Sequence, residues 1–417
     1  MSSKKLRITK FEKQRQTAEN VLVLQGGGSL GAFACGVMKA FASKNIKFDI
    51  ISGTSIGAVN GAIIAGARSD RPHKALEDFW LELAESSLHI IPDFYNLNYD
   101  QEKMAMELVK SPSASMNSAI FGVPKFFVPR WFKWDLQTSI QQEEEKNQLP
   151  SNWTYFYDNT PLAKTIEKYV DFKKLSPKSI NADEDNDPST VRLIVTAANV
   201  LTAEPIVFDS AKIQINVRHL LASTGYPQYG FPWVEAEEKV YGWDGALLSN
   251  SPIREVLEAS PREDKHVFMV ENYPRTIDRL PANMTEVQSR AKDIMFCDKT
   301  SSLIKLAKLI NKHVDLIEKL YSALNKCEHS HLMREQMAEI EKSYELLVRR
   351  YGAKILSVMR IVRKSPDHPY SQQNADFSID TIKQIIKEGE ANGLEELKSF
   401  KFKNQEIQTL SSTAKGE

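Results

Sequence analysis

A G-x-S-x-G pentapeptide, which begins at Gly53 and ends at Gly57, constrains the fold more than any other feature of this chain. It follows the short apolar run 48–51 and precedes the helix-like segment 58–67. A strand that turns sharply into a helix lifts a serine hydroxyl out of a sheet, and glycines are needed because side chains would collide there. The helix N-terminus favours developing negative charge. Ser55 is therefore predicted to be the nucleophile of a hydrolase, the alternative being a serine that merely caps the helix.

A second glycine-rich turn lies upstream, between a predicted strand at residues 21–24 and a predicted helix at residues 32–42. Its three consecutive glycines expose N–H groups that can converge on an anion at a helix N-terminus. Two anions fit this turn. One is a dinucleotide pyrophosphate, because Gly26, Gly28 and Gly31 match G-x-G-x-x-G; the other is the oxyanion of an acyl-transfer intermediate.

The position of the next acidic residue disfavours the dinucleotide. A dinucleotide site needs an acid about 20 residues on, at the carboxyl end of the second strand, to hold the ribose. In this chain that end carries the Ser55 turn, and Asp49 stands at the beginning of the strand. A nucleotide-dependent oxidoreductase is therefore disfavoured, and both turns are expected to serve one acyl-transfer site.

A serine hydroxyl needs a base, which is most often histidine. None of the eight histidines lies in a glycine-flanked turn that would present it, and His313 fits a core-facing position of a helix. Asp244 differs, because Gly242 and Gly245 flank it and the small Ala246 follows. Such an aspartate can be a turn former or a carboxylate held close to another backbone.

The glycine loop, the G-x-S-x-G turn and the Asp-Gly-Ala turn occur here in the order that is typical of patatin-like phospholipases, and the chain resembles the bacterial members of that family over about residues 20–275. The resemblance implies a Ser-Asp dyad, with Ser55 as nucleophile and Asp244 as base. Many members carry a basic residue in the glycine loop, where this chain has Ser29-Leu30. The implied oxyanion hole is formed by Gly26, Gly27, Gly28 and Ser29, and the motif glycines are Gly31, Gly53, Gly57 and Gly245.

Alternating strand and helix signals predict an α/β fold, and the resemblance implies a patatin-like three-layer sandwich with a largely parallel central sheet. Residues 191–209 predict a β-hairpin. The expected units are a flexible arm at 1–19, a catalytic domain at 20–275 with an insertion at about 71–160, an extension at 276–398 and a polar tail at 399–417.

The extension begins with apolar residues at three- and four-residue steps, which predict a helical hairpin over about 306–347. A strand at 355–362 and a helix at 379–390 follow. The hairpin could mediate homo-oligomerisation, cover the active site or bind an activating protein; packing against its own domain is favoured over these.

Within the insertion, the segment Phe121–Trp134 interleaves aromatic and basic residues. This composition suits a peripheral membrane contact or a lid over a lipid cleft, and packing on the core is the equally weighted alternative.

Composition excludes several classes of function. The chain has 417 residues, of which 54 are Lys or Arg and 54 are Asp or Glu, and this balance does not suggest nucleic acid as a partner. Its cysteines, Cys35, Cys297 and Cys327, are too few and too dispersed for a zinc site and indicate a reducing compartment. No cofactor or metal is expected. No signal peptide or membrane span is visible, so a cytoplasmic protein, peripheral at membranes, is expected, with export as an effector left open.

The sequence therefore predicts a lipid acyl hydrolase. Phospholipids, lysophospholipids, neutral glycerides and other intracellular acyl esters stay open as substrates. The alternative is a catalytically silent protein of the same fold that binds lipid or a partner.

Overall fold

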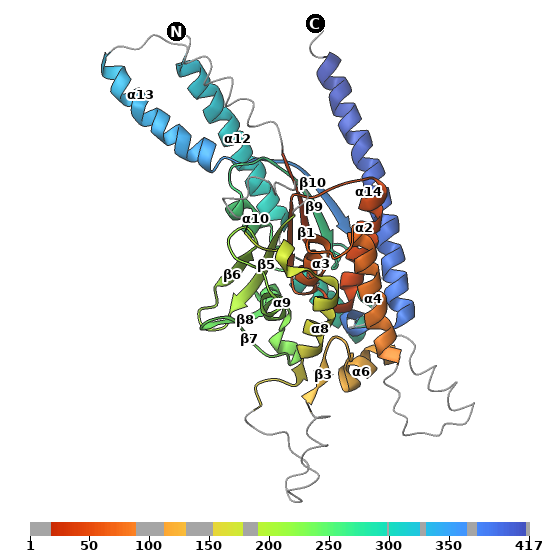
Figure 1. The fold of residues 1–417 in the computed structure, drawn as a ribbon. Helices are drawn as coiled ribbons and strands as arrows, with labels where there is room; N and C mark the ends of the chain where they lie inside the picture. The colour runs from red at the N-terminus through yellow and green to blue at the C-terminus, as the bar shows by residue number, and fades with distance from the viewer. Residues whose placement is uncertain are drawn as a thin grey trace, which may run out of the picture.

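The computed structural model describes residues 18–88, 112–130, 153–177, 191–297, 300–325, 331–364 and 373–413. Its centre is an eight-stranded sheet in the order β10-β9-β1-β2-β5-β8-β7, with β6 also paired to β5 (Figure 1). The strands are β1 (Glu19–Leu24), β2 (Ile50–Thr54), β5 (Arg192–Asn199), β6 (Pro205–Asp209), β7 (Val234–Glu237), β8 (Val240–Asp244), β9 (Lys265–Glu271) and β10 (Ile355–Val362). A separate two-stranded sheet joins β3 (Val128–Pro129) to β4 (Tyr157–Asp158).

The five strands from β10 to β5 are parallel to one another, whereas β6, β7 and β8 pair antiparallel. The predicted α/β fold with a largely parallel sheet is confirmed, as are the hairpin of β5 and β6 and the strand at 355–362. The strands run as near-continuous apolar segments because helices cover both faces of the sheet.

The helices are α2 (Ala32–Ser43), α3 (Ile56–Ala65), α4 (Pro72–Leu88), α6 (Pro112–Phe121), α8 (Thr160–Tyr169), α9 (Val217–Thr224), α10 (Ile253–Ala259), α11 (Met284–Phe296), α12 (Thr300–Leu324), α13 (His331–Tyr344) and α14 (Ile379–Thr413). Along β1, Leu22 and Leu24 belong to the larger core cluster, which includes residues of α2, α3, α4 and α14. Val21 and Val23 point to the other face, where α10 and the start of α12 close a smaller core.

Helix α14 is longer than predicted. It continues past residue 390, where the predicted helix ends, and takes in most of the predicted polar tail at 399–417. The reason is packing: the Gly393 position lies 2.8 Å, measured from an added Cβ, from the side chain of Ala40 on α2, and Leu397 beyond it is buried. Burial of the following turn outweighs the helix cost of one glycine, which is about 1 kcal/mol.

The predicted helical pair is present as α12 and α13, which meet where the rings of Tyr321 and Tyr344 stack at 3.9 Å. The face of α12 that packs on the domain differs from the predicted one. It buries Ile304, Ala307 and Val314. The predicted core stripe is largely exposed, with Leu306, Ile310, Ile317 and Leu320 at 53%, 44%, 37% and 56% exposure, and His313 is exposed too. The prediction that this stripe and His313 face the core is therefore wrong, and a role in oligomerisation or activator binding stays a prediction.

The described part of the aromatic and basic segment packs on the protein itself. Phe126 and Phe127 are buried, and the ammonium of Lys125 lies 2.7 Å from a carboxylate oxygen of Glu82. The guanidinium of Arg130 lies 4.3 Å from the ring centroid of Trp153. Residues 131–134 lie outside the described residues, so membrane contact through this segment stays a prediction. Among the residues that the structure describes, no helix is long and apolar enough to cross a bilayer.

Candidate active site

Strand β5 places the two predicted catalytic residues beside each other. Thr54, the last residue of β2, pairs with Thr196, and Asp244, the last residue of β8, pairs with the next residue of β5, Ala197. Both partners lie on the same edge of β5, because β6 occupies the other edge along residues 194–198. The turn after β2 and the end of β8 are therefore brought together, although they are far apart in sequence.

Ser55 occupies the turn between β2 and α3, and its backbone there is strained. Its φ of 56° and ψ of −131° are unusual for a residue with a side chain, and such strain costs about 1–3 kcal/mol. The turn is tight enough that a Cβ on Gly57 would lie 2.3 Å from the carbonyl oxygen of Leu24. The G-x-S-x-G pattern is thus explained at its second glycine, because any side chain at position 57 would clash with the backbone of β1.

Ser223 on α9 fixes the backbone of Ser55. The Ser55 N–H donates to Ser223 Oγ at 2.9 Å, and this hydroxyl donates to the carbonyl oxygen of Thr196 at 2.7 Å. Ser223 is fully buried. Sequence reasoning missed this role, since no local pattern around Ser223 points to Ser55.

The Asp244 carboxylate accepts the N–H of Ala246 at 2.9 Å, and the nearby Ser55 hydroxyl lowers the pKa of the same carboxyl. Asp244 is 2% exposed. Burial raises the pKa of Asp244 to about 7, and the hydrogen bonds from Ser55 and Ala246 only partly oppose that rise. A carboxylate at its ordinary pKa is a weak base at neutral pH, whereas this carboxyl titrates where general bases work best.

Two of the four residues predicted to form the oxyanion hole lie at the cavity that contains Ser55. Gly27 and Gly28 line that cavity. The N–H of Gly26 donates to Asn250 Oδ1 at 3.0 Å, and Ser29 turns its hydroxyl to the carbonyl oxygen of Gln373 at 3.0 Å. The oxyanion hole stays a prediction, and Gly27 and Gly28 are the two of its four residues that line the cavity.

The other motif glycines support these turns. The carbonyl of Gly31 accepts from Asn60 Nδ2 at 2.9 Å, Gly53 lies in β2, and Gly245 begins the short helix η5 (Gly245–Leu247). Gly28 has a φ of +58°, and a Cβ there would lie 2.3 Å from the carbonyl oxygen of Asn374 in the short helix η7 (Gln373–Ala375). The C-terminal extension therefore packs directly on the glycine loop.

A cavity of about 400 Å³ opens onto Ser55 and Asp244. This volume lies within the range of small-molecule sites. Its wall is mostly aromatic, and the insertion and the C-terminal extension supply much of it. The aromatic lining residues are Phe126, Phe127, Tyr157, Tyr226, Tyr229, Phe231, Tyr273, Phe296 and Phe377. Phe126 and Phe127 belong to the segment for which a lid over a lipid cleft was one prediction. Sequence reasoning did not find the other aromatic residues, because they come from segments with no spacing in common.

None of the histidines whose side chains the structure describes lines the cavity; the side chains of His89, His329, His331 and His368 lie outside that part of the chain. His219 is fully buried at the other end of α9, where its Nε2 lies 2.7 Å from Glu237 Oε1. Burial lowers the pKa of His219, and the contact with Glu237 opposes this. Its Nδ1 accepts the N–H of Asn216, so His219 caps a helix and does not face Ser55.

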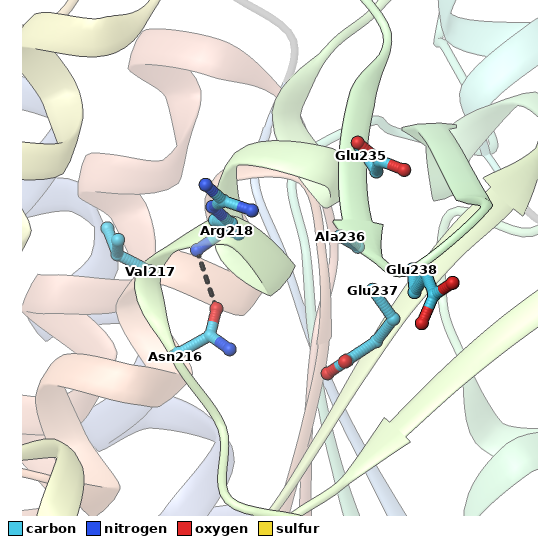
Figure 2. Close-up of a pocket in the computed structure, with 7 residues that line it drawn as sticks. All are labelled: Asn216, Val217, Arg218, Glu235, Ala236, Glu237 and Glu238. Atoms are coloured by element: carbon cyan, nitrogen blue, oxygen red, sulfur yellow. Dashed lines mark hydrogen bonds between the residues drawn. The ribbon is translucent and has the colours of Figure 1, made fainter.

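A second cavity, of about 570 Å³, lies at the start of α9 beside β7 (Figure 2). Its lining residues are Asn216, Val217, Arg218, Glu235, Ala236, Glu237 and Glu238. The dashed bond in Figure 2 runs from the Arg218 N–H to Asn216 Oδ1, at 2.9 Å. The cavity is larger, but it presents carboxylates and no hydroxyl or thiol nucleophile. The candidate active site is therefore the cavity at Ser55.

Comparison with known proteins agrees with this geometry. The model of the patatin-like phospholipase family matches residues 22–257, which contain both Ser55 and Asp244. The chain belongs to the patatin-like phospholipase family. Family membership supports lipid hydrolysis as the activity class. The match ends before α11, so the extension that completes the cavity lies outside it.

The curated patatin-like relatives match short stretches. Patatin-like phospholipase domain-containing protein 7 of Mus musculus is 40% identical over 72 residues, which are 17% of this chain and 5% of that protein. Lysophospholipase nte1 of Aspergillus terreus is 57% identical over 44 residues, which are 11% of this chain and 3% of that protein. The chain thus covers a small fraction of these relatives.

Among solved structures, VipD from Legionella pneumophila aligns with 92% of this chain and 67% of its own, at a TM-score of 0.35 and 14% identity. The type III effector protein ExoU aligns with 92% of this chain and 53% of its own, at a TM-score of 0.30 and 11% identity.

Proposed function

We propose that this chain hydrolyses lipid acyl esters with Ser55 as nucleophile and Asp244 as general base. The observation that carries the proposal is that Ser55 and Asp244 line one cavity with an aromatic wall, where the Ser55 hydroxyl acts on the pKa of the Asp244 carboxyl. Ser55 Oγ attacks the ester carbonyl carbon while its proton passes to the Asp244 carboxylate. The negative charge on the carbonyl oxygen is met by N–H groups of Gly27 and Gly28.

The second half of the reaction reuses the same groups. The tetrahedral intermediate collapses, the carbon–oxygen bond to the alcohol breaks, and Asp244 returns the proton to the leaving alkoxide. A water molecule then attacks the Ser55 acyl ester and gives its proton to Asp244. The fatty acid departs as the bond to Ser55 Oγ breaks and Ser55 takes the proton back. The apolar wall suits the acyl chain, whose burial there is favourable by about 0.8 kcal/mol per CH₂.

The proposal is tested with p-nitrophenyl esters of increasing chain length and with a lysophospholipid. Wild type should release p-nitrophenol, and Ser55→Ala should lose the activity by about 10³-fold or more. A fluorophosphonate should label Ser55 in wild type and leave Ser55→Ala unlabelled, as read by peptide mass spectrometry. A folded wild type that is neither active nor labelled would support the catalytically silent alternative.

A further inference from the structure

One buried side-chain amide, that of Asn272, holds two successive peptide groups of the glycine loop. Its Nδ2 donates to the carbonyl oxygen of Gln25 at 3.0 Å and to that of Gly26 at 3.1 Å. Asn272 is 1% exposed, directly follows β9 and lies beyond the residues that match the family model. The parallel pairing of β1 with β9, in which Leu24 lies opposite Val270, places Asn272 beside the loop.

The contact at the Gly26 carbonyl decides where the next N–H points. The described peptide bonds are all trans, and in a trans peptide the C=O and N–H point in opposite directions. Because Asn272 binds the Gly26 carbonyl, the N–H of Gly27, which belongs to the same peptide, points away from Asn272. Gly27 lines the cavity together with Ser55, and Asn272 does not. Within the described part of the chain this N–H has no acceptor.

A second amide holds the preceding peptide at its other edge. The N–H of Gly26 donates to Asn250 Oδ1 at 3.0 Å, and Asn250 Nδ2 donates to the carbonyl oxygen of Phe296 at 3.1 Å. The carbonyl of that peptide, which belongs to Gln25, is the one that accepts from Asn272. Both edges of the peptide are therefore bound, and the start of the loop cannot rotate without breaking a buried hydrogen bond.

The remaining atoms of Asn272 indicate a role beyond stability. Its backbone N–H donates to Gln25 Oε1 at 2.7 Å, and its carbonyl oxygen accepts from Arg363 Nε at 3.0 Å. Its side-chain Oδ1, however, is buried and has no hydrogen-bond partner among the described residues. A buried acceptor without a partner lowers stability, and the flipped amide would set this oxygen against two carbonyl oxygens. The amide is thus held in the one orientation that serves the loop.

We propose that Asn272 is a positioning residue for the oxyanion hole, which turns the N–H of Gly27 toward the carbonyl oxygen of the ester that Ser55 attacks. The inference rests on the proposed function and adds a residue that its transition state requires. A donor that is oriented in advance stabilises the developing oxyanion without reorganising. Its loss should therefore slow the reaction and leave substrate binding nearly unchanged.

The test measures kcat and KM for a p-nitrophenyl ester. Asn272→Leu removes the donor to both carbonyls, so kcat should fall by about 10- to 100-fold while KM stays within about twofold. Asn272→Asp sets a carboxylate against the same carbonyls and should lose more. The control is Asn311→Leu, because the Asn311 amide also binds a strand backbone, donating to the carbonyl oxygen of Ile355 at 2.9 Å. Its kcat should match wild type.

Two inhibitors of equal chain length provide a second arm. Ser55 Oγ adds to the carbonyl carbon of a long-chain trifluoromethyl ketone, its proton passes to Asp244, and the ketone oxygen becomes an oxyanion. The inhibition constant of this ketone should rise in Asn272→Leu by about the factor that kcat/KM falls. The matching long-chain alcohol forms no adduct, so its inhibition constant should stay within about twofold.

Three outcomes would overturn the inference: an unchanged kcat in Asn272→Leu, equal weakening of the ketone and the alcohol, or failure of both Asn272 variants to fold. The last two would mean that Asn272 serves the fold alone. In each case, wild-type hydrolysis that is lost in Ser55→Ala would leave the proposed function standing. Hydrolysis that persists in Ser55→Ala would contradict the proposed function and the inference together.

Discussion

The turn at Ser55 and the helix α12 differ in how completely the rest of the molecule packs around them. The Ser55 turn is held from two sides, by Ser223 on its N–H and by the backbone of Leu24 against Gly57, and it shares its cavity with Asp244. Helix α12 touches the domain with one face, which buries Ile304, and leaves Ile310 on another face 44% exposed.

The difference shows what two kinds of sequence pattern specify. A glycine that no other residue can replace fixes a backbone position, and the neighbours of that position follow from it. A three-and-four apolar period fixes a helix and its register, but it does not say which face another element covers. Helix α12 has two apolar faces. The face with Ile304 packs on the domain, and the more regular face with Ile310, which the sequence pattern emphasises, is exposed.

The largest effect is expected from Asp244→Asn. The neutral amide cannot take the proton of Ser55, so kcat/KM should fall by about 10³-fold or more. Stability should change in the opposite direction. Because the folded pKa of Asp244 is about 7 and the usual value is 3.8, the carboxyl favours the folded state when protonated, and that contribution is lost as pH rises from about 4 through 7.

At pH 8 Asp244→Asn should therefore raise the free energy of unfolding by about 1–3 kcal/mol, as measured by urea denaturation. An Asp244→Asn variant that is inactive and also less stable than wild type at pH 8 would contradict this. It would mean that the Asp244 carboxylate stabilises the Asp-Gly turn and that its burial does not destabilise the protein.

The next effect sharpens the contrast within α12. Ile304 and Ile310 are the same residue type on one helix, 9% and 44% exposed. Ile304→Ala should lower the free energy of unfolding by about 2–4 kcal/mol, because it leaves a cavity against the sheet. Ile310→Ala should cost less than about 1 kcal/mol. Equal costs in urea denaturation would show that the exposed face is covered in solution, and a change in sedimentation on dilution would then identify self-association.

The smallest effect concerns the serine that holds the nucleophile's backbone. Ser223→Ala removes the acceptor of the Ser55 N–H, so kcat should fall by about tenfold while KM changes little. Ser210→Ala is the matched control, because the buried Ser210 hydroxyl accepts the N–H of Leu193 at 2.8 Å. Leu193 lies on β5, the strand that also binds Ser223, but away from the site. Both variants should lose about 1–2 kcal/mol of stability. If Ser210→Ala lost as much activity as Ser223→Ala, the effect would be one of stability alone.

The parts of the site predicted from sequence are those where the backbone dictates the residue. Both glycine turns and the Asp-Gly turn were predicted, and their meeting follows from parallel strands β1 and β2 and from the pairing of β5 with β8. The pKa of Asp244 was not predictable, because it depends on burial from all sides. Most of the aromatic wall was not predictable either, because no local pattern links α11, η7 and the insertion; Phe126 and Phe127 are the exception, since their segment was considered as a lid.

The central claim, that a buried carboxylate is the base for Ser55, is tested most directly by the pH dependence of kcat/KM for a p-nitrophenyl ester. Activity should fall about tenfold per pH unit below an apparent pKa of about 7. A cosolvent of low dielectric constant should raise that pKa if the base is a carboxylate, because ionising a carboxyl creates charge. The pKa of a histidine would not rise, because an imidazolium loses its charge on ionisation. An acid limb near pH 4, or one near 7 that the cosolvent leaves in place or lowers, would contradict the account.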